Sequence, residues 1–377
     1  MTPDDAIELG LPQTSTRDAE VTRAALERWL GAVLPDGAEP TVVGFDAPST
    51  NGMSSETVLF DATWSDGDTR VDRALVARIA PDPVNVPVFP TYDLGRQAMT
   101  MQVVRERCPE VPVPRVLWTE PDTRVLGSPF FVMERVDGIV PPDILPYNFM
   151  SWLTEASPEQ RRRLQDSTVA VLARLHSIER PDDCLGFLPG AEGARSALAR
   201  HVDEQRDYYE WVVADGQRSP LVEQAITWLD AHWPVDEGPT VLSWGDARIG
   251  NVLYRDFEPV AVLDWEMAAL GPVELDLGWL ITLHAFFEDV AKPFDLPGLP
   301  DLLRREDVVA TYESLTGHAP RDLDFYCVYA ATRHAIIMSR IGRRAIHFGE
   351  AEMPADVDEL IPHRAMLQAM LAGEFWS

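Results

Sequence analysis

Three oxygen-bearing side chains lie close together near the middle of this 377-residue sequence, in the phrases WGDARIGNVLY and VAVLDWE. Asp246 and Asn251 belong to the first phrase, and Asp264 belongs to the second. The apolar run after Asn251 predicts a short strand, RDFEP predicts a turn, and the run before Asp264 predicts a returning strand. Because the facing ends of an antiparallel hairpin are neighbours, we expect Asn251 and Asp264 side by side at its open end.

These residue types favour a magnesium–phosphate centre. A carboxylate and an amide carbonyl are hard oxygen ligands, which suit a Mg²⁺ ion that keeps several waters and binds phosphate. Asp246 stands five residues before Asn251, in a loop with glycines that can aim its carboxylate at the same point. There it could accept a proton from an attacking hydroxyl. Either aspartate alone is better explained as a turn former, but the complete arrangement favours phosphate chemistry.

The predicted secondary structure around these residues differs between two parts of the chain. Residues 40–137 contain short alternating strands and one obvious helix, and residues 138–377 contain a succession of helices. A separate helix is predicted within residues 18–34. We therefore expect an α+β protein with an N-terminal helical extension (1–39), a small antiparallel-sheet N-lobe (40–137) and a larger, mostly helical C-lobe (138–377).

The helical part carries clear start signals. Ser157, Pro158 and Gln160 predict a helix start, since the serine and glutamine form a capping box and proline fits the first helical position. Apolar spacing predicts further helices near residues 193–214, 219–232, 274–290, 305–316 and 322–347.

Composition narrows the range of partners. The formal net charge of −29 at pH 7 disfavours binding to nucleic-acid phosphates or to anionic membranes. No apolar run reaches the length of a membrane span, and the acidic N-terminus lacks the pattern of a signal peptide. The three cysteines are widely spaced, which predicts reduced thiols without a zinc site. We expect a cytoplasmic protein without nucleic-acid or membrane partners, and its oligomeric state stays open.

The paired phrases resemble the catalytic loop and the metal-binding segment of the aminoglycoside phosphotransferase and choline kinase family. These are small-molecule kinases with the bilobal fold of protein kinases, and the resemblance implies that fold here. Four further phrases fall in the family's order: STNGMSSET at the phosphate-covering hairpin, ALVARIAP at the nucleotide strand, FFVMERVDG at the hinge and ARLHSIE before the catalytic loop. The chain also looks close to a subgroup related to the kinase-like domain fused to acyl-CoA dehydrogenases.

The resemblance implies a role for each matching residue. Asp246 resembles the catalytic base, Arg248 a cation beside the transferred phosphoryl group, and Asn251 and Asp264 the two magnesium ligands. Asp276 resembles a residue that braces the catalytic loop, although an early-helix acid favoured by the helix dipole explains it equally well. Nucleotide binding is implied for Asn51, Gly52, Ser54, Ser55, Arg78, Gln97, Met133, Glu134 and Val136.

Three positions depart from the family pattern. The sequence has a single lysine, Lys292, so Arg78 takes the place of the usual nucleotide lysine. Arginine keeps its charge and can grip phosphate oxygens with two parallel hydrogen bonds. Gln97 appears in place of the usual glutamate partner. Trp244 replaces a common histidine two residues before Asp246, where we expect it to organise the loop by packing.

These features favour an ATP- and Mg²⁺-dependent phosphotransferase that acts on a hydroxyl of a small molecule, either an aminoglycoside-like or a hydroxyacyl acceptor. The alternative is a catalytically inactive nucleotide-binding module with a kinase-like fold. A metal-dependent hydrolase is less favoured, because the sequence offers one obvious metal-binding pair. Acids beside aromatics could hold a cationic acceptor. The simpler interpretation is that these aromatics belong to the core: Tyr208, Trp211, Phe286 and Phe287.

Overall fold

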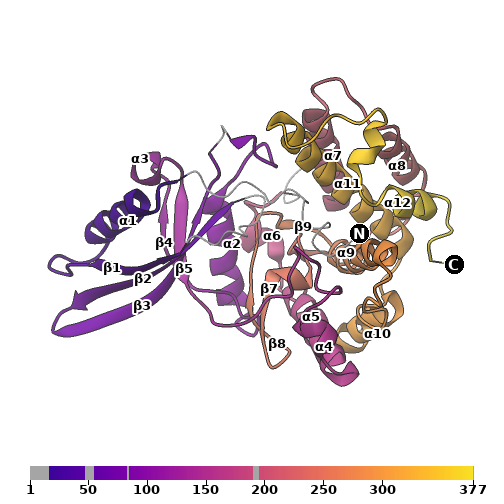
Figure 1. The fold of residues 1–377 in the computed structure, drawn as a ribbon. Coiled ribbons are helices and arrows are strands. Elements are labelled where there is room, and N and C mark those ends of the chain that lie inside the picture. The colour runs from indigo at the N-terminus through magenta and orange to yellow at the C-terminus, as the bar shows by residue number, and fades with distance from the viewer. Residues whose placement is uncertain (1–16, 47–54, 83–84, 190–194, 377) are drawn as a thin grey trace. The chain divides into compact units, whose positions relative to one another are not determined.

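The computed structural model describes residues 17–46, 55–82, 85–189 and 195–376 of the chain. Contacts divide the chain into two compact units (Figure 1). The sheet unit comprises Met1–Gln102, Pro114–Arg135 and Arg344–Ala351, and the helical unit comprises Val103–Val113, Val136–Arg343 and Glu352–Ser377.

A five-stranded antiparallel sheet with the strand order β1-β2-β3-β5-β4 forms the centre of the sheet unit. Residues on β2 alternate between buried and half-buried positions, as expected for a sheet with one face on a core. The register places Arg78 of β3 opposite Thr57 of β2 and Phe131 of β5. The strands are β1 (Thr41–Asp46), β2 (Glu56–Asp66), β3 (Thr69–Ile79), β4 (Val116–Glu120) and β5 (Phe130–Glu134).

Helix α1 (Ala19–Val33) packs its apolar face against this sheet. Leu26 and Leu30 are fully buried, and they share one cluster with Phe60 and Leu75 of the sheet. Burial of each such side chain stabilises the fold by about 1.5–3 kcal/mol. The helices α2 (Leu94–Arg107) and α3 (Thr123–Leu126) follow β3 and β4 in the chain.

The helical unit confirms the predicted helix starts and spacings. The Ser157 hydroxyl accepts from the Gln160 N–H, and the Gln160 side chain accepts from the Ser157 N–H, which completes the capping box of α5. The helices are α4 (Trp152–Glu155), α5 (Pro158–Leu175), α6 (Pro181–Leu185), α7 (Ala197–Val212), α8 (Pro220–Ala231), α9 (Glu274–Ala291), α10 (Arg305–Thr316), α11 (Leu323–His347) and α12 (Arg364–Leu371).

Two short antiparallel pairs lie among these helices. The predicted hairpin is present as β7 (Val252–Arg255) and β8 (Glu258–Val262). The sequence did not predict the second pair, in which β6 (Thr240–Ser243) lies beside β9 (Ala269–Pro272), because its two strands are far apart in the chain and very short. This second pair anchors the loop that begins directly after β6.

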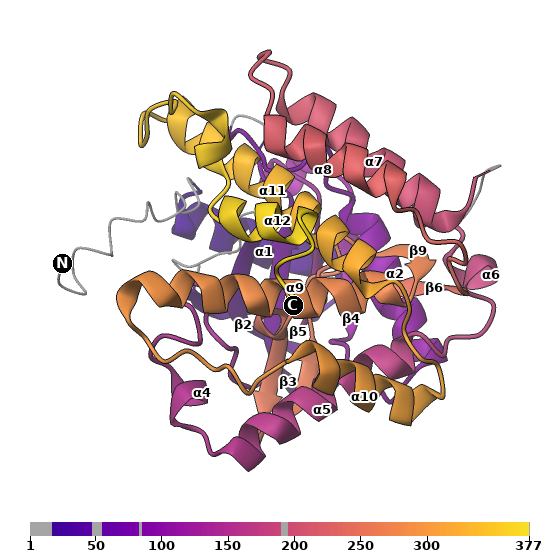
Figure 2. The same ribbon diagram turned by 90° about the vertical axis from the view of Figure 1, so that its right-hand side faces the viewer.

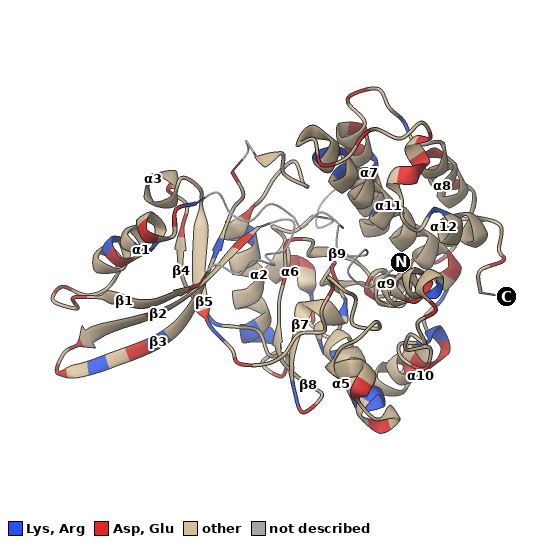
Figure 3. Cartoon of the chain, in the orientation of Figure 1, with Lys and Arg blue, Asp and Glu red and all other residues tan. Residues whose placement is uncertain are grey.

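Acidic and basic residues interleave along α5 and α10 (Figure 3). Arg162 of α5 lies 2.8 Å from Asp166 on its own helix and 3.4 Å from Asp307 of α10. Exposed pairs of this kind each contribute less than about 1 kcal/mol to stability. Among the helices that the structure describes, none is long and apolar enough to cross a lipid bilayer.

Candidate functional site

The Asp246 carboxylate lies in the loop after β6, where it is mostly buried, with 14% of the side chain exposed. Trp279 Nε1 of α9 donates to Oδ1 at 2.7 Å, and Asn251 Nδ2 donates to Oδ2 at 2.6 Å. Arg248 Nε lies 3.1 Å from both oxygens. A carboxylate held by three donors has a fixed orientation before a substrate binds, which is the property required of a positioned base.

The Arg248 side chain is held between two carboxylates. Its Nε faces Asp246, and its Nη1 donates to Asp143, which comes from the segment between β5 and α4. Burial works against the charge, but the two carboxylates outweigh it and raise the pKa of Arg248 above its ordinary value. A Cβ at Gly250 would lie 2.5 Å from both Arg248 Nη1 and Asp143 Oδ1, so glycine makes room for this pair.

Asn251 and Asp264 are brought together by the hairpin, with one difference from the prediction. Asn251 ends the short 3-10 helix η3 (Ile249–Asn251), so it precedes β7 instead of opening it. Asp264 follows β8 by two residues, because its backbone adopts a left-handed conformation (φ 57°) that turns the chain out of the ladder. Leu263 N–H still donates to Asn251 O at 2.9 Å, so the two segments remain adjacent.

This pair fits a magnesium ion by its donor chemistry. Both hydrogen bonds of the Asn251 side chain come from its nitrogen, at 2.6 Å and 3.1 Å, and they leave its carbonyl oxygen available. In the described part of the chain, no group of three or more His, Cys, Asp or Glu residues could hold a metal. Two protein oxygens nevertheless suffice for Mg²⁺ when phosphate and water supply the remaining ligands.

A fully buried carboxylate, Asp276 of α9, holds the start of the loop that carries Asp246. Its Oδ1 accepts from Ser243 Oγ at 2.7 Å and Gly245 N–H at 3.0 Å. Its Oδ2 accepts from Trp244 N–H at 2.8 Å and His176 Nε2 at 3.1 Å. Burial alone would raise the pKa of Asp276, but these hydrogen bonds outweigh it and lower the pKa. Of the two interpretations of Asp276, the contacts support the loop brace.

Trp244 and Gly245 complete the support of the loop. Trp244 is fully buried, and its Nε1 donates to the carbonyls of Leu263 at 2.9 Å and Asp264 at 3.2 Å. The expectation that Trp244 acts by packing was therefore incomplete, because its indole also makes hydrogen bonds. Gly245 has φ 90°, and a Cβ there would lie 2.0 Å from Met267 O, so no other residue fits.

Three contributors to this site were missed in the sequence: Trp279, Asp143 and Arg333. Arg333 Nη1 of α11 lies 3.2 Å from Gly245 O, and its guanidinium carbon lies 5.0 Å from the Trp279 ring centroid. Trp279 had a usable signal, because it stands three residues after Asp276 and therefore on the same helix face. Asp143 and Arg333 had none, because their partners are remote in sequence.

The residues predicted to bind nucleotide make fewer hydrogen bonds with one another than those around Asp246. Arg78 Nη1 donates to Thr57 Oγ1 at 2.9 Å. Gln97 on α2 is buried (4% exposed), and no hydrogen bond joins it to Arg78 among the described residues. Met133 and Glu134 lie on β5, where Glu134 Oε1 accepts from Arg115 N–H at 2.9 Å. Ser55 is buried, Val136 belongs to the helical unit, and Asn51, Gly52 and Ser54 lie outside the described residues.

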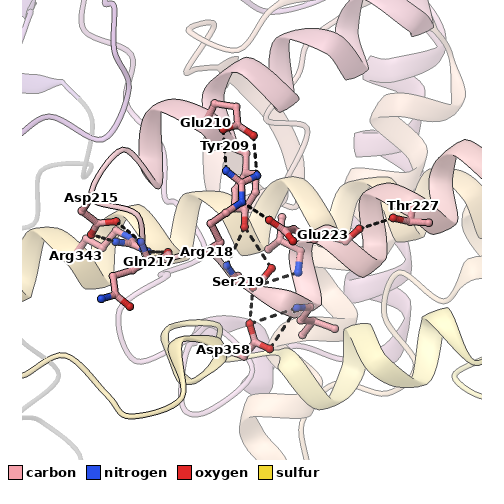
Figure 4. A network of polar contacts seen from close by, with 12 residues as sticks. Tyr209, Glu210, Asp215, Gln217, Arg218, Ser219, Glu223, Thr227, Arg343 and Asp358 are labelled. Carbon is pink, nitrogen blue, oxygen red and sulfur yellow. Dashed lines mark hydrogen bonds and ion pairs between the residues drawn. The ribbon is translucent and has the colours of Figure 1, made fainter.

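Glu210, the acid that follows Tyr209 on α7, is already partnered by arginine (Figure 4). Arg218 donates to both carboxylate oxygens of Glu210, at 2.7 and 2.8 Å, and also to Glu223. Its guanidinium carbon lies 5.2 Å from the centroid of the Tyr209 ring. This network joins α7 to α8 and neutralises Glu210 and Glu223 within the chain.

The four aromatics named in the sequence have different environments. Tyr208 is buried (7% exposed) and stacks on Trp211, with ring centroids 5.9 Å apart. The Arg340 guanidinium carbon lies 4.2 Å from the Trp211 ring centroid, so a cation of the chain itself already lies over that ring. Phe286 and Phe287 on α9 are half-buried. Tyr208 is therefore a core residue, and Trp211 is partnered within the chain.

The profile of the phosphotransferase enzyme family matches residues 52–315, which is more than half of the chain. Acyl-CoA dehydrogenase family member 10 of Mus musculus is 27% identical over 359 residues, covering 90% of this chain and 30% of that protein. Acyl-CoA dehydrogenase family member 11 of Homo sapiens is 31% identical over 169 residues, covering 44% of this chain and 20% of that protein. The chain thus spans about 30% of the length of its mouse relative.

Solved structures share the fold. A structure described as a putative aminoglycoside phosphotransferase from Ralstonia eutropha superposes with a TM-score of 0.61 at 20% identity, covering 94% of this chain and 98% of its own. Aminoglycoside phosphotransferase APH(4)-Ia, in a ternary complex with AMP-PNP and hygromycin B, gives a TM-score of 0.54 at 15% identity, covering 92% and 98%. The predicted α+β, protein-kinase-like fold is confirmed, and the chain belongs to the phosphotransferase enzyme family.

Proposed function

We propose that this chain is an ATP- and Mg²⁺-dependent kinase that transfers the γ-phosphoryl group to a hydroxyl of a small molecule. The observation that carries the proposal is the Asp246 carboxylate, which Trp279, Asn251 and Arg248 hold in one orientation. Trp279 belongs to α9, whereas Arg248 and Asn251 follow Asp246 in the same loop, so two parts of the chain fix this carboxylate. A fixed orientation suits a base that must meet an incoming hydroxyl.

In this mechanism, the oxygen of the acceptor hydroxyl attacks the γ-phosphorus, and Asp246 takes the proton of that hydroxyl. Arg248 keeps its charge, and it offsets negative charge on the phosphoryl oxygens as the bond to the leaving group breaks. Asn251 and Asp264 would hold Mg²⁺, which neutralises phosphate charge when bound. Asp276 acts through the loop backbone, so it is a positioning residue.

We assign nucleotide binding to the sheet unit and to the segment after β5. Arg78 replaces the lysine of the family in gripping phosphate oxygens. Gln97 is assigned to the same nucleotide region, although no hydrogen bond joins it to Arg78 among the described residues. Met133, Glu134 and Val136 receive adenine. Phosphate binding is also assigned to Asn51, Gly52, Ser54 and Ser55.

Two acceptor classes remain proposals. The name of the R. eutropha structure, and the hygromycin B bound to APH(4)-Ia, favour an aminoglycoside-like acceptor. The names of the mouse and human relatives favour a hydroxyacyl acceptor, although this chain spans only 30% and 20% of those proteins.

A panel assay tests the function. ADP release is measured with Mg–ATP and each of kanamycin, choline, glucose and 3-hydroxybutyryl-CoA, with ³¹P NMR to identify the phosphorylated product. We expect turnover above basal ATP hydrolysis for one class, and loss of that turnover without Mg²⁺. Asp264→Ala should abolish the Mg²⁺-dependent part of the thermal shift caused by ATP. An unchanged shift would remove Asp264 from the metal site.

An inactive nucleotide binder is the second candidate. The absence of a lysine from the β3 position favours it, as does the lack of a hydrogen bond between Gln97 and Arg78 among the described residues. Binding of Mg–ATP without phosphorylation of any panel member would support this alternative over the kinase.

A further inference from the structure

Two buried histidines of the helical unit, His334 of α11 and His363 just before α12, lie near Phe286 of α9. Helices α9, α11 and α12 come together in this unit (Figure 2). His334 stacks on His363, with ring centroids 4.7 Å apart and an interplanar angle of 27°. Phe286 packs against both rings, at 4.7 Å and 5.5 Å. The ring of Trp279, which donates to Asp246, lies 6.2 Å from His334 at 88°. A single side chain, that of Trp279, thus separates His334 from the candidate base Asp246.

The imidazole pair has unused hydrogen-bonding capacity. His363 Nε2 lies 2.9 Å from Ala331 O, and because a carbonyl only accepts, Nε2 carries the proton. His363 Nδ1 is buried and has no hydrogen-bond partner in the described part of the chain. His334 is 9% exposed, and none of the described residues makes a hydrogen bond to its ring. Since buried polar groups are nearly always partnered, this pair is suited to bind a polar group of a ligand.

The charges near the pair disfavour a cation. Burial lowers the pKa of His363 to about 4, and burial, together with His363 and Arg248, holds the pKa of His334 well below its ordinary value. Both rings are therefore neutral at pH 7. Arg333 is buried (6% exposed), lies over the Trp279 ring and forms no ion pair with a carboxylate among the described residues.

The acids that border the pair already have partners. Asp289, whose charge acts on His363, lies 3.2 Å from Lys292. Asp246, which accepts from Trp279 Nε1, pairs with Arg248. An ammonium group beside His334 would therefore lose hydration without gaining a carboxylate partner, which is costly for a buried charge.

We propose that His334 and His363 form part of the acceptor-binding surface, and that this surface selects hydroxyl compounds without an ammonium group near the reacting hydroxyl. The inference rests on the proposed function, and it names the substrate class of the same site. His334 hydrogen-bonds a neutral oxygen of the acceptor, and Phe286 packs against its apolar part. Trp279 contacts both His334 and Asp246, and Arg333 lies over its ring.

Two alcohols of equal shape test the proposal. Choline and 3,3-dimethyl-1-butanol differ in a quaternary nitrogen against a quaternary carbon, so they differ in charge and hardly in size. Each is titrated into the full chain with ¹³C-labelled histidine, in the presence of Mg–ADP, and the His334 Cε1–H resonance is followed. We expect the neutral alcohol to bind at least tenfold more tightly than choline. The exposed His232, at the end of α8, supplies a matched control, and His232→Asn should leave both affinities unchanged.

Two variants sharpen the test. His334→Asp adds the missing carboxylate and should shift the preference by at least tenfold toward choline, followed on the His363 resonance. His334→Asn keeps a neutral hydrogen-bonding group, so it should still bind the neutral alcohol more tightly than choline. This variant tests the proposal if the aspartate variant does not fold. Equal affinities, a preference of the wild type for choline, or no change at either histidine would overturn the proposal. Because binding is read without turnover, bound alcohol that is never phosphorylated counts against the proposed function and leaves the acceptor surface standing.

Discussion

In the helical unit, the Asp246 carboxylate accepts hydrogen bonds from three side chains, and Asp276 accepts from two side chains and two backbone N–H groups. In the sheet unit, Arg78 donates to Thr57, and no hydrogen bond joins it to Gln97 among the described residues. The loop that carries Asp246 is thus fixed by many hydrogen bonds, whereas we propose that Arg78 acts mainly through its charge. Proton transfer requires a precise orientation of the base, whereas a positive charge supplies much of the binding energy for a phosphate.

The largest effect is expected where the loop is most tightly held. Asp276→Asn replaces one acceptor oxygen by a donor that would face the loop N–H groups or His176. Breaking such a buried charged network typically costs about 3–5 kcal/mol, and we expect that loss in urea unfolding at pH 7. Asp324→Asn, at an exposed acid of α11, is the matched control and should cost under about 1 kcal/mol.

The same variant has a defined pH dependence. The folded pKa of Asp276 lies below the ordinary 3.8, because its hydrogen bonds outweigh burial. Its contribution to stability is therefore fully present above pH 3.8 and is lost as the pH falls through the lower folded value. The stability difference between wild type and Asp276→Asn should stay constant from neutral pH down to that point and shrink below it. A difference that grows in acid would contradict the assignment.

A smaller effect is expected for the donor to Asp246. Trp279→Phe keeps the aromatic ring under Arg333 but removes the N–H that holds Oδ1. We expect kcat to fall by about tenfold to a hundredfold, with KM for ATP unchanged, because the base is present but loosely oriented. Trp228→Phe on α8 is the control and should retain full activity. If both variants have wild-type kcat, the three-donor arrangement has no catalytic role.

The sheet unit should respond to charge more than to geometry. Arg78→Lys keeps a cation, so KM for ATP should stay within about threefold of wild type, whereas Arg78→Gln should raise it about tenfold. Steady-state kinetics with varied ATP measures both. If lysine is as damaging as glutamine, the contrast between the two units fails, since the strand then also depends on a fixed side-chain geometry.

The sequence predicted features whose partners are close in the chain. The capping box of Ser157 and Gln160, the main helices and the β7–β8 hairpin all follow from local spacing. The juxtaposition of Asn251 and Asp264 follows from that hairpin, although the left-handed backbone of Asp264 could not be read from its residue type.

Contacts between remote segments could not be predicted in this way. Asp143 meets Arg248 across 105 positions of sequence, and no local pattern marks such a pair. The stack of His334 on His363 likewise depends on how α11 meets the segment before α12. Tertiary packing alone brings such side chains together, so one sequence without its fold does not reveal them.

The direct test of Asp246 as the proton acceptor is Asp246→Asn, compared with wild type in single-turnover phosphoryl transfer and in ATP affinity. The amide keeps the size of the side chain but cannot take a proton. The account predicts that the transfer rate falls by at least about a hundredfold while the Kd for Mg–ATP stays within about threefold. A variant that phosphorylates the acceptor at the wild-type rate would contradict it.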